Sequence, residues 1–234
     1  MKTRAGVFAA IFLAGSLAYS AQEVKVLKLP AAGVDKLEID CGAGFLKVHG
    51  VEGLDSIEVN AEIRADGVGQ EKMNKFIQDH VKLTLENRGG RAVLTSAVKE
   101  NILSFSRDAV IDLTVRIPKK MDLRVDDGSG AIDIGDIIGN LDIEDGSGEM
   151  RIENIQGGLK IDDGSGSIEL RGITGDVAID DGSGSLTVVD VGGSLTIDDG
   201  SGDIDIDGVG KDLILEETGS GGLHFRNVKG QVTK

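Results

Sequence analysis

The 234-residue sequence is short of several residue types. It has no Trp, one Tyr and only 3% aromatic residues, so few rings are available to stack on sugars. Its single cysteine, Cys41, cannot form an internal disulfide. Only two prolines accompany 35 glycines, which indicates tight turns without collagen or linker character.

Positive charge is also scarce. The 25 Lys and Arg residues face 40 Asp and Glu residues, a formal net charge of −15. Such a surface repels phosphate, which argues against a nucleic-acid partner and against docking on anionic lipid. The excess lies in the second half, because residues 22–120 carry 15 acids and 15 bases, whereas residues 121–234 carry 25 acids and 8 bases. The 40% hydrophobic fraction still predicts a packed core.

The segment 1–21 has the pattern of a secretory signal. Lys2 and Arg4 precede an apolar run over 5–18, and small residues follow it, so cleavage after Ser20 or after Ala21 fits equally well. The run is shorter than the roughly 20 residues that span a bilayer, and no later segment is apolar enough. We expect an exported protein without a membrane span, in the periplasm or at the cell surface or outside the cell. In that oxidising setting a half-buried, structural Cys41 is favoured over a reactive one.

An internal repeat dominates the remainder. The tetrapeptide Asp-Gly-Ser-Gly begins at positions 127, 145, 163, 181 and 199, which defines a constant 18-residue period. Each period contains a half-period of nine, marked by apolar residues with a second apolar residue two positions later. The first members of these pairs are Leu123, Ile132, Leu141, Met150, Leu159, Ile168, Val177, Leu186, Leu195, Ile204 and Leu213. Each nonamer is therefore expected to form a short strand with two inward side chains, closed by a glycine corner.

Such strands are too short to be stable alone, but stacked copies continue one another's hydrogen bonds and apolar columns. The sequence thus predicts an all-β fold, a parallel β-solenoid with two short strands per 18-residue rung and about seven rungs. A triangular left-handed helix would need apolar residues every six positions, and calcium-binding toxin nonapeptides would need Asp where this chain has apolar residues. Apolar residues at every second corner should plug the end of the core: Ile137, Ile155, Ile173, Val191 and Val209.

The same register occurs once earlier, where Asp40-Cys41-Gly42-Ala43-Gly44 is a diverged corner. We therefore divide the chain into a signal peptide (1–21), an N-terminal strand with a first rung (22–56), an insert (57–120) and the repeat solenoid (121–234). The insert should contain a strand over 57–63, an amphipathic helix over 68–81, a hairpin that turns at 87–90, and a strand over 110–117. It could cover an open end of the stack or form a lateral flap.

The export signal, the early rung, the strand that ends in Val115-Arg116-Ile117-Pro118 and the serial L-x-I-x-x-G-S-G-x-I-x-I units resemble the bacterial putative-adhesin family. The likeness covers nearly all of the mature chain and rests on the order of elements. It implies a parallel β-solenoid in an envelope setting, with no known ligand. The DDGSG corners of this chain are more regular than that family's pattern.

Two acidic columns are the main chemical candidates. Asp127, Asp145, Asp163, Asp181 and Asp199 should stack at rung spacing, beside a second, solvent-facing column of Asp126, Glu144, Asp162, Asp180 and Asp198. Carboxylates about 4.8 Å apart repel by roughly 0.9 kcal/mol in water and about four times that at an effective dielectric of 20. We favour capping by the following Ser and Gly amides as the offset, and calcium bridging is the alternative.

Other functions have less support. Phe76 and Phe225 occupy core-type positions, so no ring is evidently spare for a glycan. A polysaccharide-active β-helix enzyme would need a convergent acid and base, but the Asp pairs repeat identically, and His49, His80 and His224 are scattered. We predict no catalytic residue, metal site or cofactor. The expected role is a non-catalytic envelope structural or interaction module with an unknown envelope or surface partner, and the acidic face and the exposed stack end are its two candidate contact surfaces.

Overall fold

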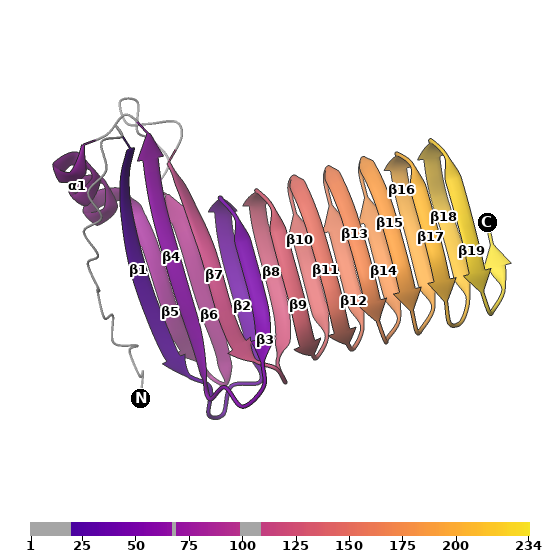
Figure 1. Ribbon diagram of the computed structural model, residues 1–234, viewed down its shortest axis with the longest axis horizontal. Coiled ribbons are helices and arrows are strands. Elements are labelled where there is room, and N and C mark those ends of the chain that lie inside the picture. The colour runs from indigo at the N-terminus through magenta and orange to yellow at the C-terminus, as the bar shows by residue number, and fades with distance from the viewer. Residues whose placement is uncertain (1–19, 67–68, 99–108) are drawn as a thin grey trace.

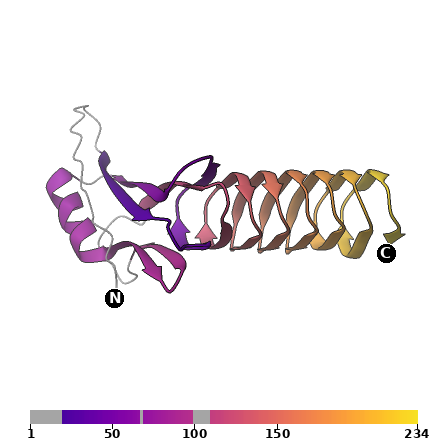
Figure 2. The same ribbon diagram turned by 90° about the horizontal axis from the view of Figure 1, so that it is seen from below.

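The computed structural model describes residues 20–66, 69–98 and 109–234, so the predicted signal segment lies almost wholly outside the described residues. Two ten-stranded sheets face each other along an elongated rod (Figure 1). Seen from below, the chain winds from one sheet to the other and back in successive turns (Figure 2). The predicted all-β, parallel β-solenoid is confirmed.

Each turn of the solenoid contributes one strand to each sheet. The successive pairs are β2 (Lys36–Ala43) and β3 (Leu46–Val51), β8 (Asp122–Ser129) and β9 (Ile132–Ile138), β10 (Leu141–Asp145) and β11 (Gly148–Gln156), β12 (Leu159–Asp163) and β13 (Gly166–Ile173), β14 (Val177–Asp181) and β15 (Gly184–Val191), β16 (Leu195–Ser201) and β17 (Ile204–Val209), and β18 (Leu213–Ser220) and β19 (Leu223–Val228). A short final strand, β20 (Val232–Thr233), pairs with β18.

The rungs are stacked in register at the 18-residue period of the sequence. Leu141 pairs with Leu123 on one side and with Leu159 on the other, both in parallel. A shift between Ile197 and Asp198 lengthens the offset by one position in the last rung. Every side chain in the regular part therefore lies between two residues from the equivalent slot of neighbouring rungs.

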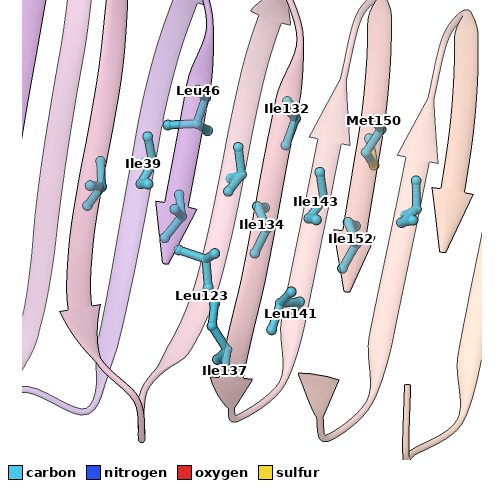
Figure 3. Close-up of a cluster of buried hydrophobic side chains, with 14 of the residues drawn as sticks. Ile39, Leu46, Leu123, Ile132, Ile134, Ile137, Leu141, Ile143, Met150 and Ile152 are labelled. Carbon is cyan, nitrogen blue, oxygen red and sulfur yellow. The ribbon is translucent and has the colours of Figure 1, made fainter. Parts of the chain in front are cut away.

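The predicted apolar slots form one continuous core between the sheets. Leu123, Ile132 and Ile134 are almost fully buried, as are their equivalents in later rungs as far as Leu213. Figure 3 shows these side chains pointing inward from both sheets in adjacent rungs. The corner residues Ile137 and Ile155 are fully buried as well, which confirms their predicted role as plugs at one end of the core.

The insert extends the same two sheets. Strands β4 (Ser56–Asp66) and β7 (Val110–Pro118) lengthen one sheet, and the hairpin of β5 (Val81–Arg88) and β6 (Arg91–Val98) lengthens the other. The edge strand β1 (Ser20–Pro30) pairs antiparallel with β4. Helix α1 (Gln70–His80) lies across the end of the stack and buries Met73, Phe76 and Ile77 (Figure 2). The insert thus covers one end of the solenoid instead of forming a lateral flap.

A left-handed backbone position recurs in the second corner of the rungs from β9 onward. Asp136, Asn154 and Asp190 have φ of 60°, 58° and 59° at equivalent positions, and Gly172 has φ of 67°. This conformation brings Cβ close to the following carbonyl oxygen. Gly tolerates it because it has no Cβ, and Asn and Asp tolerate it because their short polar side chains can form local hydrogen bonds. The corner geometry is therefore retained along the rod although the residue type changes.

Glycine is required for a different reason at the second glycine of each Asp-Gly-Ser-Gly corner. A Cβ placed on Gly184 would lie 1.4 Å from the carbonyl oxygen of Gly166, and one on Gly166 would lie 1.7 Å from that of Gly148. The backbones of adjacent rungs approach so closely here that no side chain fits between them.

These two kinds of glycine predict different costs of substitution. Gly184→Ala should lower the free energy of unfolding by more than about 4 kcal/mol or prevent folding, because the rungs must separate. Gly172→Ala should cost only about 1–2 kcal/mol, since its Cβ would have 3.6 Å to its nearest neighbour and only the backbone strain remains. Urea unfolding followed by circular dichroism measures both, and equal costs would contradict the steric argument.

Candidate contact surfaces and a buried aspartate column

The first aspartates of the corners form a column inside the solenoid. Alternate residues of a strand point the same way, so the residue two positions after an inward apolar residue also points inward. The column consists of Asp127, Asp145, Asp163, Asp181 and Asp199, which are 0–6% exposed and pair in register from strand to strand.

Four of these five carboxylates have one oxygen capped in the way the sequence predicts. Oδ1 of Asp145 accepts a hydrogen bond from the Ser147 amide at 3.2 Å, and the same bond recurs at 3.2, 3.0 and 3.1 Å in the next three rungs. Oδ2 of each of the five aspartates, and Oδ1 of Asp127 as well, is buried and has no hydrogen-bond partner among the described residues. The amide caps therefore offset only part of the cost of burying the column.

The cost of burying these carboxylates that the amide caps do not offset is seen in the raised pKa values of the column. Burial, followed by the charges of the neighbouring Asp145 and Asp181 carboxylates, raises the pKa of Asp163 from 3.8 to about 6, although the hydrogen bond from the Ser165 amide lowers it. Burial likewise raises the pKa of Asp181 to about 6, with Asp199 adding to it. The pKa of Asp127 also reaches about 6, chiefly through burial. The folded column thus holds protons more tightly than the unfolded chain does.

Cys41 occupies the place before Asp127 in this column. The two residues pair in register between β2 and β8. Burial, followed by the charge of Asp127, raises the pKa of the Cys41 thiol well above its ordinary value. The thiol therefore stays protonated, and the half-buried Cys41 fits the predicted structural role.

The buried column predicts that stability falls with rising pH. A carboxyl whose folded pKa is raised to about 6 stabilises the fold fully below its unfolded pKa of 3.8, and this contribution is lost as the pH rises through about 6. Asp163→Asn should raise the free energy of unfolding at about pH 7.5 by about 1–2 kcal/mol, because it removes one buried charge while retaining the Oδ1 acceptor. It should also weaken the pH dependence of thermal unfolding.

Asp162→Asn is the matched control. Asp162 is the adjacent residue on the same strand, but its side chain is exposed. It should change the free energy of unfolding by less than about 0.5 kcal/mol. A stability that rises between about pH 5 and about pH 7.5, or equal effects of the two substitutions, would exclude a raised folded-state pKa of the buried column.

The second acidic column faces solvent, as the sequence predicts. Asp126, Asp162 and Asp180 are exposed, and Glu144 and Asp198 are half-buried. Arg124 binds two of the acids on this face, with 2.6 Å to an oxygen of Asp142 and 2.7 Å to one of Glu144. These contacts lie across adjacent rungs and reduce the repulsion between their charges.

The described residues contain no group of three or more His, Cys, Asp or Glu side chains placed to hold a metal ion. We expect the melting temperature of residues 22–234 in millimolar Ca²⁺ to match that in EDTA within about 1 °C, whereas a ligand that binds only the folded state would raise it. Circular dichroism is the suitable probe for a chain without Trp, and a clear upward shift would restore the calcium alternative.

The histidines remain apart in the structure. His49 lies on β3, with Nε2 2.9 Å from Asp136 Oδ2. The ring of His80, on α1, lies 5.6 Å from that of Phe76, and His224 lies on β19. They do not form a catalytic group.

The exposure of the phenylalanines differs partly from the prediction. Phe76 is buried, and Phe105 lies outside the described residues. Phe225 is 39% exposed, so its predicted place in the core is wrong. It pairs in register with the inward Ile206, but among the described residues no further strand of that sheet lies beyond it.

A shallow depression of about 220 Å³ lies at this end, lined by residues of β15, β17 and β19 that include Asp205, His224 and Phe225. It brings carboxylates close to bases, as an enzyme site would require. However, Asp207 accepts hydrogen bonds from Arg226 at 2.7 Å and from Asn227 at 2.6 Å, and these contacts lower its pKa. This carboxylate is the ion-pair partner of Arg226.

The comparisons with known proteins identify the family. The model of the Toastrack DUF4097 family matches residues 6–233. This chain belongs to the Toastrack DUF4097 family. That assignment agrees with the resemblance to the putative-adhesin family inferred from the repeat. No curated protein matches the chain at a significant level.

Solved structures similar to this Toastrack chain are distant in sequence. A putative cell adhesion protein from Clostridium sporogenes is 11% identical, with a TM-score of 0.41 over 92% of this chain and 98% of that one. A putative adhesin from Bacteroides fragilis is 12% identical, with a TM-score of 0.35 over 90% and 96% of the two chains. A putative lipid binding protein from Parabacteroides distasonis is 14% identical, with a TM-score of 0.35 over 91% and 97%. Among the described residues, no helix has the length and hydropathy to cross a membrane.

Proposed function

We propose that this chain is an exported, non-catalytic structural and interaction module of the bacterial envelope. The observation that carries the proposal is the asymmetry of the rod. One end is covered by α1, whereas the last rung exposes Phe225 and Val232. A stack of this kind is stiff because every rung is hydrogen bonded to the next, so it can hold one contact surface at a fixed distance from the other end.

The composition of the side faces supports a passive rod between the two ends. Ion pairs between adjacent strands, such as Lys47 with Asp133 at 2.7 Å, neutralise part of the outward charge. The family membership and the predicted signal over residues 1–21 support an exported location. We assign no substrate, metal or cofactor to the module.

A cell fractionation experiment with site-specific photocrosslinking tests this function. The full chain, with a crosslinking amino acid at position 225 or at position 178 on an outward face, should reach the envelope fraction. A chain that lacks residues 2–18 should stay in the cytoplasm. Position 225 should give a discrete adduct of higher mass, and position 178 should give little or none.

Retention of the full chain in the cytoplasm would contradict export. Absence of an adduct at position 225, in cells where the chain is exported and folded, would contradict an interaction role for the exposed end. Protease resistance of the exported chain provides the check on folding.

A further inference from the structure

We propose that the outer edge of β19 binds an extended acidic segment of a partner protein, which adds to the sheet as one more strand. This inference rests on the proposed interaction function and specifies the partner's chemistry. Four features of the described residues support it: an unpaired strand edge, exposed inward-type side chains, a reversal of charge, and the strand already paired with β19.

The edge of β19 is available for pairing. β19 is the terminal strand of its sheet and pairs only with β17, so the backbone groups along its outer side have no partner strand among the described residues. Extended peptides add to such edges through backbone hydrogen bonds, and alternate side chains provide the specificity.

The inward-pointing side chains are buried at one end of the rod and exposed at the other. At the covered end, Leu27 and Leu29 of the edge strand β1 are 2% and 3% exposed. At the other end, Phe225 of β19 is 39% exposed and Val232 of β20 is 41% exposed. Lys234 lies over the Phe225 ring, with Nζ 5.5 Å from its centroid, and covers it only in part. An added strand with apolar alternate residues would bury this surface.

The charge reverses at the same place. Residues 121–220 carry 25 acids and 5 bases, whereas residues 221–234 carry three bases, Arg226, Lys229 and Lys234, and no acid. A basic edge on an otherwise acidic rod attracts an acidic segment and repels a basic one.

The strand that already pairs with β19, on its inner side, indicates which sequence pattern would pair with its outer edge. β17 pairs there with an alternating sequence, Ile204-Asp205-Ile206-Asp207, that places Ile206 beside Phe225 and Asp207 beside Arg226. The Arg226 guanidinium donates to Asp207 at 2.7 Å. A partner strand of the same alternating apolar and acidic pattern would meet equivalent groups on the outer side.

A second copy of the chain is a poorer occupant. Two such ends would bring basic edges together. The edge strands at the covered end are also net basic, since β1 carries Lys25 and Lys28 against Glu23, and β5 carries Lys82 and Arg88 against Glu86. Charged edges of this kind oppose end-to-end association of copies.

The test uses a labelled peptide with the sequence of residues 203–210, Asp-Ile-Asp-Ile-Asp-Gly-Val-Gly, and the purified mature chain at low salt. The control peptide has Lys at the three Asp positions. Fluorescence anisotropy should show binding of the acidic peptide, weakened by added salt, and at least about tenfold weaker binding of the Lys peptide. Hydrogen exchange should slow in residues 223–228 on binding and remain unchanged in β9.

Two variants check the surface. Lys229→Glu combined with Lys234→Glu should weaken the acidic peptide about tenfold by reversing the charge, and Phe225→Ser should do so by removing apolar contact. Both changes lie in the last rung, so circular dichroism should show an intact solenoid. Arg124→Glu, a charge reversal far along the rod, is the matched control and should leave peptide affinity unchanged.

Absence of binding at about 1 mM acidic peptide, or equal affinity for the two peptides, would overturn the inference. Sedimentation that shows a dimer dissociated by the peptide would identify a second copy as the occupant and would overturn it too. A photocrosslinked partner at position 225 in cells, combined with no peptide binding, would leave the proposed function intact and reject only the acidic-strand chemistry.

Discussion

The structure depends on one constraint, the in-register stacking of rungs with an 18-residue period. In a parallel stack each side chain has the equivalent residue of the next rung as its nearest neighbour, about 4.8 Å away. Apolar residues gain from this arrangement, because Leu123, Leu141 and Leu159 form one column without gaps. The same constraint places like charges together and leaves no room for side chains where the backbones approach.

The buried aspartate column is the most costly result of that constraint. The corner needs a residue that accepts a hydrogen bond from the serine amide, and Asp145 accepts it through Oδ1. Because the corner residue points inward, its second oxygen is removed from water as well. Formation of the corner therefore buries a carboxylate and raises its pKa. The column then ends at Cys41 and Thr218, neutral residues that replace aspartate where the regular repeat stops.

Much of the fold could be predicted from the sequence, because periodicity is a property of the sequence and register follows from it. The nine-residue spacing identified the strands, the corners and the plug residues such as Ile137. The solvent-facing column was also predictable, since Asp126 and Asp162 are out of phase with the apolar residues. The left-handed corner was missed, although Asp136, Asn154, Gly172 and Asp190 recur at the 18-residue period and share a tolerance for positive φ.

The rest could not be predicted because it depends on which strands are neighbours. The periodicity predicts a core position for Phe225. The side chain is exposed because, among the described residues, no strand follows β19 in the sheet. The extent of burial of Asp163 depends on the width of the solenoid, which the repeat does not encode. The position of α1 across the other end depends on the pairing of β1 with β4, two strands on opposite sides of the first rung in the sequence.

The regular offset of the rungs has a consequence for how such a rod can vary in length. Gain or loss of one complete 18-residue unit between Asp127 and Asp199 would leave every remaining residue beside an equivalent neighbour. The helix-covered end and the basic last rung would be unchanged, and only the distance between them would differ, by about 4.8 Å for each unit. The reach of the rod can therefore vary separately from its two ends.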